Sequence, residues 1–237
     1  MDQVGVYYIN LADRADRRAN IEHTLIDSGL DQYNVTRTCA VDTRRLSANE
    51  LNARFPDTER IFHKNALDAV QRGYRKKHSE LTSGSIGLYL SMLSTLKTFL
   101  ESDKQFAFIM EDDAVLAQGI TKADVAKVLE RGVTESSCDI LLLCHLFTAN
   151  EPTADFHNVQ IKRFVMLSAY LISRAGAQKI IDAALPMYAQ LDWFLSDMSE
   201  KGQLTIKAVL PALFVQAPFS NADGSWDSMQ QDQPYLK

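Results

Sequence analysis

The stretch FAFIMEDDAVL, residues 106–116, decides the fold class of this chain. Phe106 to Met110 is a compact apolar run of strand length, and the carboxylates of Glu111, Asp112 and Asp113 follow it directly. In open α/β sheets ligands bind outside the carboxyl ends of strands. The position of this acidic cluster therefore matters as much as its composition.

Strand and helix patterns alternate on both sides of this stretch. Besides residues 106–110, we expect strands at residues 4–11, 33–41, 140–147, 164–172 and 204–215, the last interrupted by Pro211. We expect a first helix that ends at Ser28-Gly29, in which Ile21, Leu25 and Ile26 form an apolar face. Further helices are expected over 85–100, from Thr121 to Gly132, from Ser173 to near Pro186, and over 191–198. Such alternation predicts an α/β domain with a largely parallel sheet.

Residues 42–80 differ from the rest because they are rich in charge. Ser47 and Glu50 have the spacing of a helix cap, as do Thr121 and Asp124 further on. The basic run RGYRKKH, residues 72–78, is either a solvated loop or a lid that closes over a diphosphate or an anionic acceptor. With no repeat and no linker, residues 1–237 are expected to form a single domain with a charged insertion or lid at about 42–80.

Composition excludes several classes of protein. The formal charge of -5 gives no general attraction to nucleic acid or to an acidic membrane. No segment has the roughly 20 apolar residues that span a bilayer, and the first residues lack a signal peptide's basic cluster. Three cysteines without metal-site spacing fit a reducing, cytoplasmic compartment. Cys144 and His145 lie in an apolar run and are expected to be buried.

The acidic cluster predicts a cation site. Three adjacent carboxylates repel one another, and a fold gains by grouping them mainly when a cation neutralises them. Oxygen ligands favour Mg2+ or Mn2+, which are commonly bound by one or two carboxylates together with substrate phosphates. The alternative is that Glu111, Asp112 and Asp113 simply end a strand in solvent.

A second candidate site runs from Asn10 to Arg18, at the end of the first expected strand. Arg14, Arg17 and Arg18 can pair with phosphate, and a helix amino terminus also attracts anions. The alternative is a helix with a basic, solvated face. If this strand lies beside residues 106–110, both sites face one crevice and can hold opposite ends of a nucleotide diphosphate.

Four blocks of the sequence resemble the family-25 glycosyltransferases, which include lipopolysaccharide galactosyltransferases and the collagen galactosyltransferases. They are residues 4–18 (VGVYYINLADRADRR), 84–116 (from GSIGLYL to MEDDAVL), 168–181 (SAYLISRAGAQKII) with LDWFL at 191–195, and 210–220 (LPALFVQAPFS). The chain departs from the family at Met92, where the family usually has His. Methionine cannot donate a hydrogen bond or act as a base.

The resemblance implies a GT-A-like fold, with a Rossmann-like, mostly parallel sheet flanked by helices. It implies transfer of a hexose, galactose above all, from a UDP-sugar with inversion at the anomeric carbon. The acceptor is a saccharide, a lipid-linked saccharide or a protein, with peripheral membrane contact through the basic run. Donor binding is implied for Asn10, Leu11, Arg14, Arg17, Arg18, Ile86, Gly87, Glu111 and Asp112.

Roles can be assigned to the acidic residues on this basis. Asp113, helped by Asp112, is expected to hold Mn2+ or Mg2+, with Glu111 as a supporting partner. Asp192 is the candidate general base, because Trp193 and Phe194 beside it can stack on a sugar face. Asp197 is held in reserve, and a helix cap is the competing interpretation of Asp192.

Two other functions remain open from the sequence. One is a catalytically inactive nucleotide-sugar-binding protein of the same fold, for which Met92 is the only support. The other is a phosphorelay receiver-like domain, which also places paired acids after an apolar strand. In a receiver the phosphoacceptor position falls on Cys144, which is not an aspartate.

Overall fold

The computed structural model describes residues 2–43, 82–135, 137–145 and 156–217, together with positions 46, 47, 49, 50, 53, 64, 71 and 219. The expected lid at about 42–80 and the basic run at 72–78 therefore lie almost wholly outside the described residues. Within them, Ser47 and Glu50 form the expected cap, since Ser47 N donates to Glu50 Oε2 at 2.7 Å and Glu50 N donates to Ser47 Oγ at 3.2 Å.

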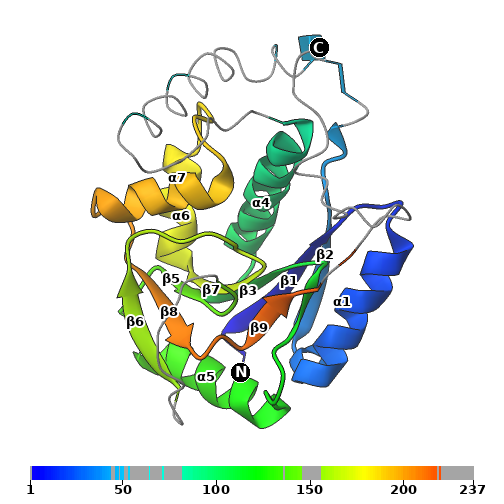
Figure 1. Ribbon diagram of the computed structural model, residues 1–237, viewed down its shortest axis with the longest axis vertical. Helices are drawn as coiled ribbons and strands as arrows, with labels where there is room; N and C mark the ends of the chain where they lie inside the picture. Colours follow the sequence, from blue (N-terminus) through cyan, green and yellow to red (C-terminus); the bar gives the residue numbers. More distant parts are fainter. Residues whose placement is uncertain are drawn as a thin grey trace.

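A seven-stranded sheet forms the middle layer of the fold, in the order β2-β1-β3-β7-β5-β8-β6 (Figure 1). Its strands are β1 Val4–Asn10, β2 Asn34–Cys39, β3 Phe106–Glu111, β5 Ile140–Leu142, β6 His157–Ile161, β7 Ala169–Ser173 and β8 Ile206–Leu210. Strands β2, β1, β3, β5 and β8 run in one direction, and β7 and β6 run in the other. The sheet is therefore mostly parallel, as predicted.

Helices cover both faces of this sheet (Figure 1). One hydrophobic cluster joins α4, α6 and α7 to one face, and a second cluster joins α1 and α5 to the other. Successive residues of a strand point to opposite faces, and accordingly Tyr7 and Ile9 enter the first cluster while Val6 and Tyr8 enter the second. The helices are α1 Ala15–Ser28, the 3-10 turn η1 Leu30–Gln32, α4 Ser83–Glu101, α5 Lys122–Glu135, α6 Arg174–Ala183 and α7 Leu191–Glu200.

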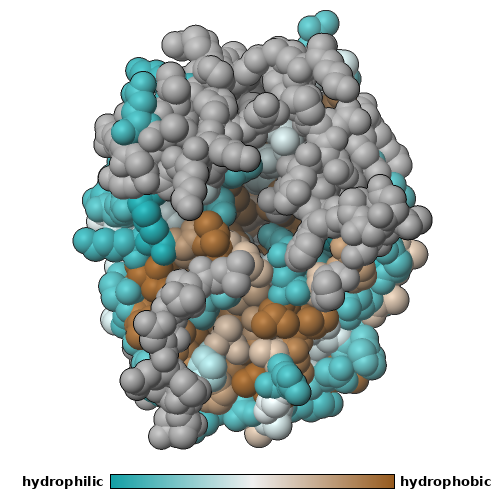
Figure 2. All heavy atoms as spheres, in the orientation of Figure 1, coloured by the Kyte–Doolittle hydropathy of each residue, from teal (hydrophilic) through white to brown (hydrophobic). Residues whose placement is uncertain are grey.

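A short antiparallel ribbon of β4 (Ala114–Leu116) and β9 (Phe214–Gln216) follows the acidic stretch. Leu213 N and Phe214 N both donate to Leu143 O at 3.0 Å, which ties the ribbon to the segment after β5. Because Ala114 pairs with Gln216, the ribbon brings the end of β9 beside Asp113. Figure 2 shows hydrophobic surface in the region of β9, where Val215 is 43% exposed.

Several expected boundaries are wrong. The expected strand 164–172 begins only at Ala169, as β7, and the irregular segment before it includes Met166 with φ 75°. Strand β6, at 157–161, was not expected. The expected strand 140–147 ends at Leu142, because Leu143 N and Cys144 N both donate to Ala169 O and the chain bends there. In α1 the expected apolar stripe includes Ile26, but that side chain is 51% exposed.

Gly132 does not end α5, which continues to Glu135. A Cβ at Gly132 would lie 2.9 Å from Leu171 Cδ2. The glycine therefore allows the helix to approach the sheet closely, which is a packing role.

The expected cap at Thr121 and Asp124 is also present, since the two residues bond reciprocally. The helix expected from Ser173 is capped by that residue, whose Oγ accepts a bond from Gly176 N at 3.1 Å. Among the described residues, no helix is long and apolar enough to cross a membrane.

Candidate functional site

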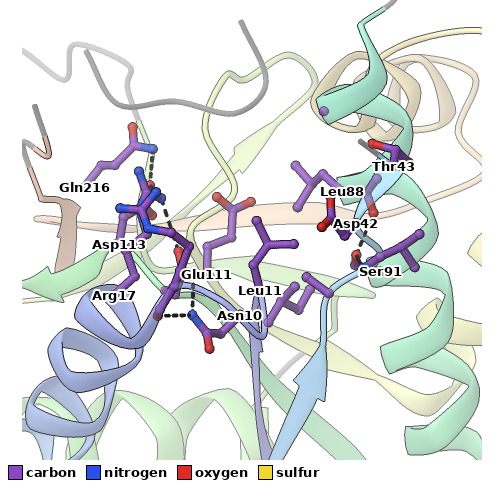
Figure 3. Close-up of a pocket in the computed structure, with 17 residues that line it drawn as sticks. Asn10, Leu11, Arg17, Asp42, Thr43, Leu88, Ser91, Glu111, Asp113 and Gln216 are labelled. Atoms are coloured by element: carbon purple, nitrogen blue, oxygen red, sulfur yellow. Dashed lines mark hydrogen bonds and ion pairs between the residues drawn. The ribbon is translucent and has the colours of Figure 1, made fainter. Parts of the chain in front are cut away.

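A cleft opens at the carboxyl ends of β1, β2 and β3, the position at which ligands bind in open α/β sheets. It encloses about 730 Å³ of empty space, part of it open to solvent. Figure 3 shows Arg17, Asp113 and Gln216 on one side and Asp42, Thr43, Leu88 and Ser91 on the other, with Glu111 between them. The condition for one shared crevice is met, because β1 pairs with β3 and Ile9 lies opposite Glu111.

Asp112 is held by a network on the α1 side of the sheet. Asn10 Nδ2 donates to Asp112 Oδ2 at 2.8 Å, and Arg17 Nη1 donates to Asp112 Oδ1 at 3.2 Å. Asn10 Oδ1 in turn accepts a bond from Arg37 Nη2 at 2.8 Å. Because a guanidinium has only donors, the Asn10 amide can satisfy both neighbours in one orientation only.

Asp113 is approached by donors on one oxygen. Gln216 Nε2 donates to Asp113 Oδ2 at 2.7 Å, and Arg17 Nη1 lies 3.7 Å from the same oxygen. Asp113 Oδ1 is buried and has no hydrogen-bond partner within the described part of the chain. Burial raises the pKa of Asp113, and the neighbouring Asp112 adds to the rise, while the Gln216 bond and Arg17 oppose it.

Glu111 is the carboxylate that Figure 3 shows directed into the space between the two walls. Its backbone is anchored, since Glu111 N donates to Ser168 O at 2.8 Å. Burial raises the pKa of Glu111 well above its ordinary value, and the charges of Asp113, Asp112 and Asp192 add to the rise. A cation in the cleft would therefore relieve a concentration of negative charge.

The basic residues of the candidate site from Asn10 to Arg18 separate in the structure. Arg14 and Leu11 line the cleft together with Arg17. Arg14 also pairs with Asp16 at 2.7 Å. Arg18 does not line the cleft and pairs instead with Glu22 at 2.7 Å, with its side chain 49% exposed.

Ile86 and Gly87 lie in the first turn and a half of α4. Ile86 is 3% exposed, belongs to the core and does not line the cleft. Gly87 does line it, and a Cβ there would lie 2.7 Å from Val41 O. Gly87 thus lets α4 pack against the segment after β2, which forms the second wall.

The candidate bases lie on α7. Asp192 is within electrostatic range of Glu111, and Asp192 Oδ1 accepts a bond from Trp193 N at 2.9 Å in the first turn. Asp197 accepts bonds from Tyr188 Oη at 2.7 Å and from Lys201 Nζ at 2.6 Å, so that it is engaged within the helix region. Phe194 is 1% exposed and cannot stack on a sugar.

Of three positions noted in the sequence, Met92 and Cys144 are core residues, whereas His145 is less buried than expected. Met92 is 1% exposed in the cluster under α4 and does not line the cleft. Cys144 is buried as expected, and burial raises the pKa of its thiol to about 12. His145 is partly buried, with its Nε2 2.8 Å from Val209 O.

Sequence reasoning missed Arg37 and Gln216 as site residues. Arg37 lies within a strand, and no motif marks it. Gln216 lies in the block at 210–220, but only the pairing of β9 with β4 shows that it reaches Asp113.

The donor set fits a divalent cation held jointly with a ligand. No group of three or more His, Cys, Asp or Glu side chains suited to a metal exists among the described residues. Asp113 Oδ1 nevertheless lacks a donor there, and Glu111 shares the cleft with it. One or two carboxylates completed by phosphate oxygens is a common way for proteins to bind Mg2+.

Two solved structures are similar in overall arrangement. One is A197 from STIV, with a TM-score of 0.45 and 12% identity over 87% of this chain and 81% of that chain. The other is S. aureus TarS in complex with UDP-GlcNAc, with a TM-score of 0.47 and 11% identity over 98% of this chain and 61% of that chain. The curated proteins include no significant match.

The sequence model of glycosyltransferase family 25 (LPS biosynthesis protein) matches residues 3–195. This range takes in the three strands that end at the cleft, the acidic stretch after β3, and six of the seven strands of the main sheet. With most of its 237 residues matched, the chain belongs to glycosyltransferase family 25.

Proposed function

We propose that this glycosyltransferase moves a hexose from a UDP-sugar to a hydroxyl of a saccharide or glycoconjugate acceptor, with inversion and with the help of Mn2+ or Mg2+. Galactose is the sugar that the family resemblance implies. The observation that carries the proposal is that Glu111 and Asp113 reach one cleft at the strand ends, beside Arg14. The whole chain is taken as one domain.

Asp113 is the main candidate ligand of the cation, because its Oδ1 has no protein donor in the described chain. Glu111, which faces the cleft, is the second. Asp112 has a supporting role, because Asn10 and Arg17 donate hydrogen bonds to its two oxygens and Arg17 also lies near Asp113. When bound, the ion supplies positive charge to the diphosphate oxygens of the departing UDP.

The remaining steps belong to side chains around the cleft. Arg14 is placed to pair with a phosphate, beside the start of α1. The acceptor hydroxyl attacks the anomeric carbon from the side opposite UDP, so that a new C–O bond forms as the bond to UDP breaks. Asp192 takes the hydroxyl proton, and we prefer it to Asp197 because the charge of Asp192 acts on Glu111, which lines the cleft.

The two alternatives have less support. The inactive-protein reading depends on Met92, but Met92 is a core residue that leaves the cleft unchanged. Family membership argues against a receiver-like domain, and Cys144, at the phosphoacceptor position, is 1% exposed.

The first test measures UDP release from a panel of UDP-sugars, with and without Mn2+. We expect metal-dependent release from one donor. Asp113→Ala should reduce the rate of UDP release by roughly 100-fold. Loss of a residue that only supports a metal ligand already lowers metal affinity or activity by about 10–100-fold. Asp103→Ala is the matched control, because that side chain is 85% exposed and lies away from the cleft.

Binding of a UDP-sugar without any turnover would support the inactive-protein alternative. If no UDP-sugar is bound or turned over in the presence of metal, the proposed donor class is wrong.

A further inference from the structure

The end of β9 and the residues after it make three contacts with the acidic side of the cleft. Gln216 Nε2 donates to Asp113 Oδ2 at 2.7 Å, and Ala217 N donates to Asp113 O at 2.7 Å. The ring of Phe219 lies 4.7 Å from the Arg17 guanidinium carbon. All three residues lie beyond the family match, which ends at 195.

We propose that Gln216 is a positioning residue that sets which oxygen of Asp113 is available to a cation, with Phe219 confining Arg17 on the same side. The inference rests on the proposed function, because it concerns the cation-binding carboxylate of that site. Gln216 touches Asp113 and acts through it.

The geometry at Asp113 is asymmetric. Both donors that approach the carboxylate, Gln216 and Arg17, lie at Oδ2, at 2.7 Å and 3.7 Å. Oδ1 is buried without a donor among the described residues. A buried polar atom without a hydrogen-bond partner destabilises the fold. A fold that satisfies only one oxygen of Asp113 therefore keeps the other for a ligand at the expense of stability.

The position of Gln216 is set by the backbone. Gln216 pairs with Ala114, the residue after Asp113, in the β4–β9 ribbon. Its amide must present Nε2 to Asp113, because the amide oxygen would place two acceptors together. Arg17 has two contacts that hold its guanidinium in place. The Phe219 ring covers the guanidinium, and Asp112 accepts a hydrogen bond from Nη1.

The test is calorimetric titration of the full chain with Mn2+ alone. Gln216→Met keeps the length of the side chain and removes the donor. We expect Mn2+ to bind about 10-fold more weakly, as is typical when a partner of a metal ligand is lost. Val215→Met is the matched control, because Val215 is the neighbouring residue of β9, is 43% exposed and does not line the cleft.

Gln216→Asn provides a second variant, which keeps an amide but is too short to reach Asp113, and it should show the same loss. Thermal melting of each metal-free variant checks that it folds. The inference is overturned if Mn2+ binds equally to the wild type and to a folded Gln216 variant, or if the wild type binds no Mn2+.

UDP release is a separate measurement. Turnover of a UDP-sugar by the wild type, combined with unchanged Mn2+ affinity in the variants, would leave the transferase assignment standing and remove only the role of Gln216.

Discussion

At the scale of single residues, strand alternation separates the neighbouring carboxylates. Glu111 continues the series Ala107 and Ile109, which faces α4, and Asp112 contacts Asn10 and Arg17 on the α1 side. Successive strand residues point to opposite faces. Glu111 and Asp112 therefore cannot have the same role, although they are adjacent and chemically alike.

The raised pKa of Glu111 predicts a pH-dependent stability. A carboxyl whose pKa is higher in the folded protein binds its proton more tightly there, so it destabilises the fold once the pH rises above its ordinary value of 4.5. Glu111→Gln should raise the melting temperature of the metal-free protein at pH 8. The difference should shrink as the pH falls toward 4.5.

Melting curves of both proteins from pH 4.5 to 8 provide this measurement. Glu101→Gln controls for the loss of one carboxylate, because Glu101 is exposed at the end of α4. A Glu111→Gln protein that is less stable than the wild type at pH 8 would contradict the prediction.

At the scale of helices and strands, sequence prediction was accurate where an element is determined by its own residues, and less accurate where it depends on contacts with residues distant in sequence. The elements with strong apolar patterns and caps, such as α4, β3 and α6, lie where the sequence predicts them. Gly132 is a common stop signal, but its role in α5 is contact with Leu171, a residue distant in sequence. β6 was missed because it is short and only Val159 and Ile161 of its five residues are apolar.

Helix α4 is ended from another element, by Arg174 at the start of α6. The Arg174 guanidinium donates to Ser102 O at 3.0 Å, to Lys104 O at 2.9 Å and to Leu100 O. Leu100 lies in the last turn of α4, and Ser102 and Lys104 follow the helix. A positive charge there also interacts favourably with the helix dipole.

We therefore expect Arg174→Met to lower the free energy of unfolding by about 2–4 kcal/mol, since several charge-assisted hydrogen bonds are lost together. Urea denaturation measures the change. Arg174→Lys should recover only part of the loss, because one ammonium group cannot reach all the carbonyls. Lys127→Met, an exposed site on α5, is the control, and an equal effect at both sites would contradict the role of Arg174.

At the scale of the whole molecule, the sequence was enough to predict the sheet class and the location of the cleft. The motifs at Asn10–Arg18 and Glu111–Asp113 lie together because β1 pairs with β3. The contributions of Arg37 and Gln216 depend on pairing between distant strands, which no local pattern encodes. These two residues could be found only from the assembled fold.

The sheet order predicts that the region matched by the family is not a stable unit. Strand β8 lies between β5 and β6, and its residues 206–210 follow the end of the match at 195. A fragment of residues 1–195 would leave an unpaired edge on both neighbours. We expect it to show no cooperative thermal transition by circular dichroism, whereas the full chain melts cooperatively. A cooperative transition in the fragment would show that β8 is dispensable.

The contacts of Gln216 and Phe219 have a consequence for how the protein is made. A ribosome releases the chain from its amino terminus, so the nascent protein carries Asn10, Arg17 and the acidic stretch well before the residues that complete their surroundings. Asp113 and Arg17 remain without these two partners until residues 216 and 219 have been translated. Premature termination before residue 216 would therefore yield a product that has the acidic motif but lacks the amide that orients Asp113.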